Sequence, residues 1–244
     1  MGNAGSVDSF EQDGSAARVS LFDDWKVTSI GLVFERQAHA DGFRFVAGVD
    51  EVGRGCLAGP VVAGVCILDP AKPLPKGLDD SKKLTPERRE DIAAELKETC
   101  LAYATGQIEA DEIDRINILE ATKKAMLLAV GTLSPQADFL LIDAIQLKRS
   151  PLPQKAIIKG DSISASIAAA SILAKTYRDD LMRAYDLEYP QYGFAGHKGY
   201  GAASHFEAIR THGPCVLHRK SFRGVLPDAV EKTDLFDFLP PGKV

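Results

Sequence analysis

Four acidic side chains follow short apolar segments, at positions where a charged group needs a positive partner. They are Asp50 and Glu51 after 43–49, Asp143 after 139–142, and Asp161 after 156–159 with one glycine between. Burying one carboxylate costs several kcal/mol unless a cation or hydrogen-bond donors compensate it. No basic residue follows Asp50 before Arg54, so the sequence indicates a partner from elsewhere, such as a metal ion or a substrate.

Carboxylates at the ends of separate strands can serve one site. Ligands of α/β sheets gather in the crevice beyond the strand ends, so we expect side chains from different strands to converge there. Carboxylate oxygens suit Mg²⁺ or Mn²⁺, whereas zinc prefers cysteine and histidine. Two such ions about 3.5–4 Å apart activate a water and stabilise the leaving oxygen of a phosphodiester. The spacing therefore favours a metal site of this kind.

Each of these acids also has a purely structural interpretation. Asp161 can cap the helix that follows it, and Asp143 can begin a turn. Glu51 follows Asp50 directly, and neighbouring side chains of a regular strand point to opposite faces. Both acids can serve one site only if the strand ends there, which Gly53 allows, or if Glu51 contributes its backbone carbonyl.

The apolar pattern predicts strands that first pair locally and later alternate with helices. We expect strands over 43–49, 60–68, 101–108, 139–142 and 156–159, and helices over 29–40, 86–99, 114–133, 162–186 and 202–211. Thr85 and Pro86 open the second helix, because threonine caps and proline suits the first helical position. Asp161 or Ser162 is expected to cap the long helix. The order predicts an α/β fold with a mixed sheet and helices on its faces.

The composition is that of an ordinary globular protein, with 45% hydrophobic and 26% charged residues among 244. We expect one domain over 29–224, between a disordered lead-in over 1–28 and an acidic tail over 225–244. No apolar run reaches the roughly 18 residues of a membrane span, and the acidic N-terminus does not resemble a secretory signal. The four cysteines form no CxxC pair, which argues against a zinc cluster or a disulfide framework and favours a reducing, cytoplasmic setting.

The net charge of -5 conceals a balanced centre. The excess acids lie in the two ends, and between them basic residues cluster at Lys82-Lys83, Arg88-Arg89, Lys148-Arg149, His197-Lys198 and His218-Arg219-Lys220. Neutral bulk with local basic clusters permits polyanion binding. Ordinary solvated charge explains any single cluster at least as well.

Five motifs, in order along the chain, resemble bacterial ribonuclease HII. They are GVDEVGRGCLAGPVVAG, LDDSKKLTPERRE, LLIDA, IIKGDSISASIAAASILAKTYRD and HKGYG, and the resemblance covers about 47–222. It implies a ribonuclease-H-like α/β fold, a five-stranded mixed sheet flanked by helices, with a helical C-terminal part. It also implies an endonuclease that cuts the RNA strand of RNA–DNA hybrids. Such an enzyme nicks duplex DNA 5′ of an embedded ribonucleotide and leaves 3′-hydroxyl and 5′-phosphate ends.

The resemblance assigns a role to the four acids. The catalytic, metal-binding residues of the family fall on Asp50, Glu51, Asp143 and Asp161, and Asp50 is placed to bridge two Mg²⁺ or Mn²⁺ ions. The sister family, ribonuclease HIII, has a glutamate at the fourth position and a sizeable N-terminal substrate-binding domain. Asp161 and the short lead-in therefore favour ribonuclease HII. One departure is Cys56, where many relatives have proline.

Substrate recognition follows from the same resemblance. The substrate-binding residues that it implies are Gly53, Arg54, Gly55, Ser81, Lys82 and Tyr200. The backbone of the glycine-rich turn contacts the ribose 2′-hydroxyl, Tyr200 packs on the sugar at the RNA-to-DNA junction, and Ser81 and Lys82 contact phosphate. The structural alternatives are a plain tight turn, a buried tyrosine and solvated lysines. Lys175 and Asp179 share a helix face four residues apart, so we expect an ion pair there.

Three other functions stay open on the sequence. A non-catalytic nucleic-acid binder needs basic grooves but not four acids at one site, so metal-dependent cleavage distinguishes it. A serine hydrolase is suggested by Gly160-Asp161-Ser162, but the chain lacks GxSxG. A transposase or resolvase on the same fold would act on all-DNA strands, whereas the substrate contacts implied for Gly53–Gly55 and Tyr200 require a ribonucleotide.

The two ends of the chain suggest a protein partner. Leu21-Phe22 and Leu235-Phe236 resemble the short peptides by which bacterial replication proteins dock on the sliding clamp. Neither copy has the leading glutamine, and packing of these pairs onto the domain is the favoured alternative. We expect a monomer that binds RNA–DNA hybrids or ribonucleotide-containing duplexes and has no membrane contact.

Overall fold

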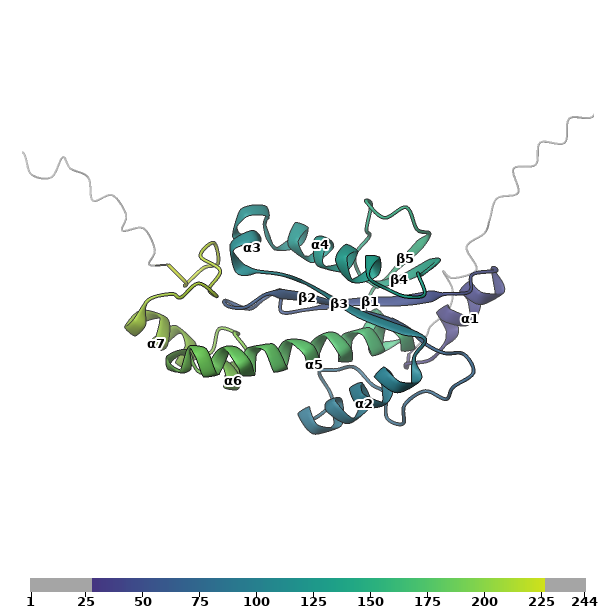
Figure 1. The fold of residues 1–244 in the computed structure, drawn as a ribbon, viewed down its shortest axis with the longest axis horizontal. Coiled ribbons are helices and arrows are strands. Elements are labelled where there is room, and N and C mark those ends of the chain that lie inside the picture. The colour runs from purple at the N-terminus through teal and green to yellow at the C-terminus, as the bar shows by residue number, and fades with distance from the viewer. Residues whose placement is uncertain (1–27, 227–244) are drawn as a thin grey trace, which may run out of the picture.

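A five-stranded mixed sheet forms the centre of the molecule (Figure 1). The computed structural model describes residues 28–226. The strands are β1 Val46–Val52, β2 Val61–Ile67, β3 Ala102–Ile108, β4 Phe139–Asp143 and β5 Gln154–Ile157, in the spatial order β3-β2-β1-β4-β5. The first three strands pair antiparallel, whereas β4 and β5 run parallel to β1. The predicted mixed sheet is confirmed.

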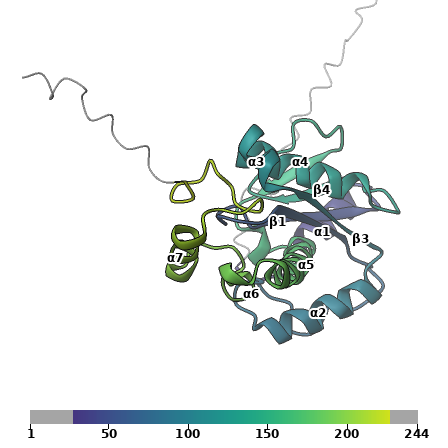
Figure 2. The same cartoon turned by 60° about the vertical axis from the view of Figure 1, so that its left-hand side comes forward.

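Helices cover both faces of this sheet. They are α1 Val33–Ala40, α2 Pro86–Thr99, α3 Ala110–Ile116, α4 Ile118–Gly131, α5 Ala165–Glu188, α6 Phe194–His197 and α7 Ala203–His212. Figure 2 shows α4 on one face, α5 on the other and α2 outside α5. Thr85 caps α2 as predicted, since its Oγ1 accepts the Arg88 N–H at 3.3 Å. The short helices α6 and α7 make up the predicted helical C-terminal part.

Helix α5 lies directly against the sheet, because two glycines of the strands place no side chain between the helix and the sheet. A Cβ on Gly48 would lie 2.0 Å from the carbonyl carbon of Ser166, and one on Gly64 would lie 2.3 Å from the Ala170 oxygen. The helix contributes small buried residues along the same stretch, Ala168, Ala169, Ala170, Ser171 and Ala174 among them. This close packing brings the middle of α5 against the residues that follow Gly48 in β1.

The opposite face of the sheet carries the larger apolar core. Side chains of β1, β2 and β4 pack there against the buried face of α4, including Val49, Val65, Leu140, Ala125 and Met126. A smaller cluster joins Ile92 and Leu96 of α2 to α5. Each fully buried aliphatic side chain contributes about 1.5–3 kcal/mol relative to its exposed state. The sheet is therefore fixed from both sides, which makes its strand ends a rigid support.

The helix predicted over 114–133 is wrong as one element, because α3 and α4 meet at a break. Asn117 adopts a φ of 68°, in the left-handed region, and so ends α3. Its side-chain oxygen accepts the N–H groups of Leu119 and Glu120 at 3.0 and 3.1 Å and caps α4. Apolar residues recur at helical spacing on both sides of the break, so periodicity alone did not reveal it.

The prediction that Asp161 or Ser162 caps the long helix is also wrong. Both residues lie in a 3₁₀ turn, η1 Gly160–Ser162, that precedes α5. The cap is Ser164, whose Oγ accepts the N–H of Ile167 at 3.4 Å. The first predicted helix, over 29–40, begins later, at Val33. Asp161 therefore keeps its carboxylate for another role.

No helix within residues 28–226 combines the length and apolar character that crossing a membrane requires. The predicted lead-in over 1–28 and the tail over 225–244 lie almost wholly outside the described residues. The Leu21-Phe22 and Leu235-Phe236 pairs lie outside them as well.

Candidate active site

Strand β1 does not end before the two adjacent acids. It pairs with β2 through Asp50, Glu51 and Val52. Its pairing with β4 stops at Val49 and Ile142, just before Asp50. The expected early strand end is therefore wrong, because β2 still supplies backbone partners. Successive side chains alternate, so the two carboxylates leave opposite faces of the strand. Only the β4 side of β1 is open here, and the acids sit beside that opening.

Asp50 points toward α5. Its side chain is 4% exposed, and Ser171 of α5 donates a hydrogen bond to it. Burial, together with the negative charges of Glu51 and Asp143, raises the pKa of Asp50 to about 8, and the Ser171 bond only partly opposes the rise. No cationic side chain among the described residues bonds this carboxylate directly, and Lys82, whose charge Asp50 favours, bonds Asp161 instead.

Asp143 ends β4 next to the point where that strand leaves β1. Its Oδ1 accepts the N–H of Gly160 at 2.7 Å, which ties the strand end to the η1 turn. Burial and the charge of Asp161 raise the pKa of Asp143, while the Gly160 bond opposes the rise. Asp143 and Asp50 take the same face, because they extend the register Val49–Ile142 by one residue.

Asp161 reaches the same place from the η1 turn. Its Oδ2 accepts a hydrogen bond from Lys82 Nζ at 2.7 Å, and the same nitrogen lies 3.9 Å from Asp80 Oδ1. Partial burial disfavours the charged lysine, but the hydrogen bond and charge of Asp161, with Asp80 and Asp50 nearby, outweigh it and raise the pKa of Lys82. Three carboxylates from β1, β4 and η1 therefore share one electrostatic environment.

Glu51 is on the other face of β1 and turns toward Arg54. Arg54 Nη1 lies 3.1 Å from Glu51 Oε1, while Glu51 Oε2 is buried with no hydrogen-bond partner. Burial raises the pKa of Glu51, and the bond from Arg54 opposes the rise. An orphaned buried carboxylate oxygen is costly, so a positive ligand would stabilise this residue.

The chemistry of these acids fits a hard divalent cation. All the donors are carboxylate oxygens, one is an orphan, and the charged form of Asp50 is disfavoured by its surroundings. Within residues 28–226, no three Asp, Glu, His or Cys side chains are grouped closely enough to form a metal cluster by themselves. Metal binding by Asp50, Glu51, Asp143 and Asp161 thus stays a prediction.

The Gly53-Arg54-Gly55 turn follows β1 directly. Gly53 has a φ of +87°, and a Cβ there would lie 2.3 Å from Arg178 Nε, so only glycine fits. A Cβ on Gly55 would meet nothing within 4 Å, so glycine there leaves the backbone open on its outer side. The side chain of Arg54 is 44% exposed beside Glu51. The turn can therefore present both backbone and a guanidinium to an external group.

Two buried arginines that sequence reasoning missed hold this turn in place. Arg178 and Arg219 are both 0% exposed. They donate to main-chain carbonyls, Arg178 to Ala58 and Pro60 at 3.0 Å each, and Arg219 to Arg54 at 2.9 Å and Gly59 at 2.8 Å. One signal was present for Arg178, which continues at four-residue spacing the buried stripe of Ala170 and Ala174. Arg219 gave no comparable signal.

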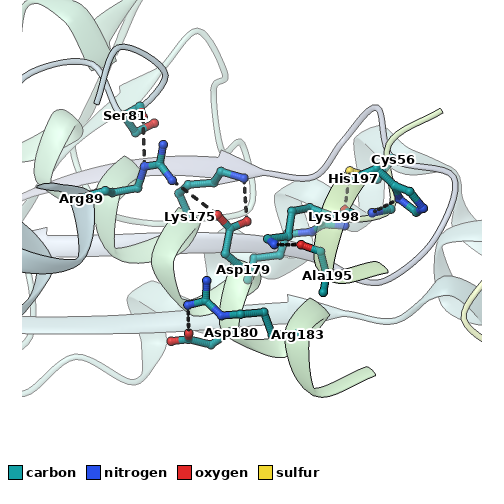
Figure 3. Close-up of polar contacts among 12 residues, drawn as sticks. Cys56, Ser81, Arg89, Lys175, Asp179, Asp180, Arg183, Ala195, His197 and Lys198 are labelled. Atoms are coloured by element: carbon teal, nitrogen blue, oxygen red, sulfur yellow. Dashed lines mark hydrogen bonds and ion pairs between the residues drawn. The ribbon is translucent and has the colours of Figure 1, made fainter. Parts of the chain in front are cut away.

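Tyr200 follows α6 and is 43% exposed, so the alternative of a buried structural tyrosine is wrong. Lys175 Nζ lies 6.0 Å from the centre of its ring. Burial of part of the ring raises the pKa of Tyr200, and a contact with Cys56 adds to the rise. Cys56 is buried and lies 3.7 Å from the Lys198 carbonyl (Figure 3). Cys56, where many relatives have proline, thus packs beneath the loop that contains Lys198 and Tyr200.

The predicted ion pair of Lys175 and Asp179 is confirmed, with 2.6 Å between Nζ and Oδ1. Figure 3 shows that Asp179 also accepts a hydrogen bond from Arg89 of α2, with 3.4 Å between Oδ2 and Nη1. Arg89 Nε in turn donates to the Ser81 carbonyl at 3.0 Å. A single carboxylate on α5 therefore connects the loop that contains Ser81 to the lysine under Tyr200.

Ser81 and Lys82 differ in what they can contact. Ser81 is buried, and its hydroxyl lies 2.9 Å from that of Ser171, the residue that bonds Asp50. This places Ser81 behind Asp50 rather than at the surface. Lys82 is largely exposed and ends at Asp161. Of the two, Lys82 is the side chain available to a phosphate near the acids.

The chain is similar to ribonuclease HII proteins over most of its length. The family model described as ribonuclease HII matches residues 47–225. The ribonuclease HII of Chlamydia caviae is 56% identical over 193 residues, which cover 78% of this chain and 89% of the relative. The crystal structure of ribonuclease H2 from Pyrococcus horikoshii OT3 matches with a TM-score of 0.63 at 26% identity, covering 75% of this chain and 95% of that one. The ribonuclease HII of Archaeoglobus fulgidus, solved in complex with PCNA, matches with a TM-score of 0.61 at 25% identity, covering 72% and 92%.

Proposed function

Because this chain belongs to the ribonuclease HII family, endoribonucleases that cut the RNA strand of RNA–DNA hybrids, we propose that it also nicks duplex DNA at embedded ribonucleotides. The cut is on the 5′ side of the ribonucleotide and leaves 3′-hydroxyl and 5′-phosphate ends. The observation that most supports this proposal is the meeting of Asp50, Asp143 and Asp161 in one electrostatic environment.

The four acids would hold the Mg²⁺ or Mn²⁺ ions that this reaction requires. Two ions bound there would activate a water and stabilise the leaving 3′-oxygen of the phosphodiester. Asp50, Asp143 and Asp161 share one side of the strand ends, and Glu51, whose side chain leaves the other face of β1, would contribute its backbone carbonyl. Because burial raises the pKa of Asp50, ion binding is coupled to proton release and strengthens as pH rises.

The glycine-rich turn would recognise the ribose. The outer side of Gly55 is open, so its backbone can approach a 2′-hydroxyl without a side chain between them. Arg54 is exposed beside the acids and would hold the phosphate at the cut. Arg219 would act only through the turn, by fixing the Arg54 carbonyl, and Arg178 through the Ala58 and Pro60 carbonyls that follow it.

Tyr200 and Lys82 would contact the strand on the two sides of the acids. The exposed face of Tyr200 would pack on the sugar next to the ribonucleotide and crowd a second 2′-hydroxyl. Lys82 would exchange Asp161 for a phosphate oxygen when the ions neutralise that carboxylate. Ser81 supports Asp50 through Ser171.

The experiment is a nicking assay on a duplex with one ribonucleotide, labelled at either end. We expect cleavage only with Mg²⁺ or Mn²⁺, one product ending in a 3′-hydroxyl and the other starting with a 5′-phosphate. A cyclic phosphate end, or full activity in a chelator, would contradict metal-dependent attack by water and favour attack by the ribose hydroxyl.

A sliding clamp is the second partner that a specific observation favours, since the Archaeoglobus fulgidus relative was solved with PCNA. We propose that one end of this chain makes the contact, through Leu21-Phe22 or Leu235-Phe236. Peptides spanning 16–25 and 230–239 can be titrated against the clamp, with scrambled peptides as controls. Binding of both peptides no tighter than the scrambled ones would end this proposal. A monomeric state and a cytoplasmic setting stay predictions beside it.

A further inference from the structure

Two buried histidines form a hydrogen-bonded chain beneath Tyr200. His205 of α7 and His218 are almost fully buried, and their Nε2 atoms lie 3.1 Å apart. His205 Nδ1 lies 2.8 Å from the carbonyl oxygen of Tyr200, and His218 Nδ1 lies 3.0 Å from the N–H of Cys215. Three of the four ring nitrogens face one partner each, and His218 Nδ1 also lies 3.2 Å from the Cys215 Sγ.

The partners at the two ends fix every proton in this chain. The Tyr200 carbonyl can only accept, so His205 Nδ1 carries hydrogen and its Nε2 is bare. The Cys215 N–H can only donate, so His218 Nδ1 is bare and its Nε2 carries hydrogen. His218 Nε2–H then donates to His205 Nε2, with one hydrogen for each bond. The chain is complete only when both rings are neutral.

The chain also connects the two elements that would read the substrate. The segment containing His218 pairs with residues 57–59, which follow the glycine-rich turn. Gly59 N–H donates to the Leu217 carbonyl and Arg219 N–H to the Leu57 carbonyl, both at 2.8 Å. Leu57 in turn donates to Gly199, next to Tyr200, at 2.8 Å. The histidines thus close a ring of contacts around residues 57–59.

Neighbouring groups leave the pair no acidic partner. The ring of His197 stacks on His205 with 4.2 Å between centroids, and Tyr192 lies 4.8 Å from His218. His197 is itself fixed, accepting from Gly199 N–H at 3.1 Å and reaching the Tyr192 carbonyl at 2.7 Å. The groups that face the pair are the rings of His197 and Tyr192, the Tyr200 carbonyl and Cys215, and none of them is a carboxylate. Burial outweighs the hydrogen bonds to the main chain and lowers the pKa of both imidazoles.

We propose that His205 and His218 are positioning residues that hold the Tyr200 main chain in register with the Gly53-Arg54-Gly55 turn. In this role they set the preference for a lone ribonucleotide over a continuous hybrid. The inference rests on the proposed function, because it requires Tyr200 to read the junction. The histidines themselves contact no substrate.

The kinetic test compares His205→Leu with His205→Asn in the full chain. Asparagine keeps an N–H donor near the Nδ1 position, so it should restore the bond to Tyr200 that leucine removes. The readout is kcat/KM for a single-ribonucleotide duplex divided by kcat/KM for a long hybrid. We expect leucine to lower this ratio several-fold and asparagine to return it to within about twofold, with Tyr200→Ala giving the largest loss.

Two outcomes separate the inference from the function on which it rests. If Tyr200→Ala changes the ratio and both His205 variants match the wild type, the positioning role is wrong and the proposed function stands. If Tyr200→Ala leaves the ratio unchanged on an active enzyme, the junction-reading role fails, and this inference fails with it.

A second measurement does not depend on any variant folding. The ¹⁵N chemical shifts of the imidazoles in the wild-type protein report which nitrogen carries hydrogen. We expect His205 protonated at Nδ1 and His218 at Nε2, both neutral at pH 6. The opposite tautomer at either ring, or a charged ring at pH 6, would overturn the chain.

Discussion

Asp50 is a buried carboxylate whose charged form is opposed by its own surroundings. We expect Asp50→Asn to reduce metal-dependent cleavage by orders of magnitude while the fold is kept, and Asp143→Asn to do the same. Near-normal turnover of either variant at saturating Mg²⁺ or Mn²⁺, measured at steady state, would show that the residue is not an ion ligand.

The same substitution has a signature in stability. The folded-state pKa of Asp50, about 8, lies above the ordinary value of 3.8, so the folded protein binds more protons across this window. Metal-free wild type should therefore lose stability as pH rises from about 4 to 8, and Asp50→Asn should lose less. Urea unfolding at several pH values in a chelator measures this, and identical slopes would contradict the assignment.

His218 predicts the opposite slope. Burial and the neighbouring His205 lower its pKa from 6.5 to about 4, so the unfolded chain binds more protons between these values. Stability should fall as pH drops through this window, by up to about 3 kcal/mol from this residue. Denaturant unfolding should show a shallower decline for His218→Gln, although that variant is less stable at pH 7. Equal declines would mean that His218 is not held neutral.

The sequence predicts which residues form much of the candidate site, but not the direction in which their side chains point. Acids at strand ends can be recognised by type and order, so the sequence alone identifies Asp50, Glu51, Asp143 and Asp161 as candidates. The face of the sheet that each side chain takes depends on strand register. The sequence does not show that β1 continues to pair with β2 beyond Asp50 and Gly64. Arg178 and Arg219 were missed because their partners are backbone carbonyls, which every residue has.

Helix α5 is the element that positions the proposed recognition residues. It provides Ser171 to Asp50, Asp179 to Arg89 and Lys175, and Arg178 to the glycine-rich loop. Its alanine-rich first half can approach the sheet because Gly48 and Gly64 of the strands lack side chains. Small residues on a helix signal close packing, but the sequence did not show which partner it meets.

Arg178→Met tests this positioning. The variant keeps the volume of the buried stem and leaves carbonyls of the loop unpaired, which costs about 1–3 kcal/mol for each such group. We expect lower stability in urea and a kcat/KM on ribonucleotide substrates reduced at least tenfold. The matched control is Arg183→Met on the same helix, whose ion pairs with Glu90 and Asp180 are exposed and contribute about 0–1 kcal/mol. Equal effects of the two substitutions would remove the special role of Arg178.

The break at Asn117 gives an element-scale prediction away from the acids. Asn117→Ala loses the cap of α4 and forces alanine into a left-handed conformation, which together cost about 2–3 kcal/mol. Asn117→Gly keeps the conformation and loses only the cap, so its cost should be smaller. Cleavage rates at 25 °C should stay unchanged in both. If alanine were as stable as glycine in thermal or urea unfolding, α3 and α4 would join without strain.

At the scale of the whole molecule, the order of strands and helices was sufficient to predict a mixed sheet with helices on its faces. Element limits were less predictable, because capping and packing place them. The helix over 114–133 divided at Asn117, and the cap of α5 moved to Ser164. The joining of 217–219 to 57–59 depends on a contact between distant parts of the chain, which no local pattern encodes.

If the proposed function is right, cleavage at the acids occurs only where the adjacent turn finds a 2′-hydroxyl. The most direct measurement compares three duplexes of one sequence, with a single ribonucleotide, a 2′-O-methyl nucleotide or a deoxynucleotide at the same position. We expect one nick, 5′ of the ribonucleotide, and rates lower by orders of magnitude on the other two. Comparable cutting of the all-deoxy duplex, or a cut on the 3′ side of the ribonucleotide, would contradict it.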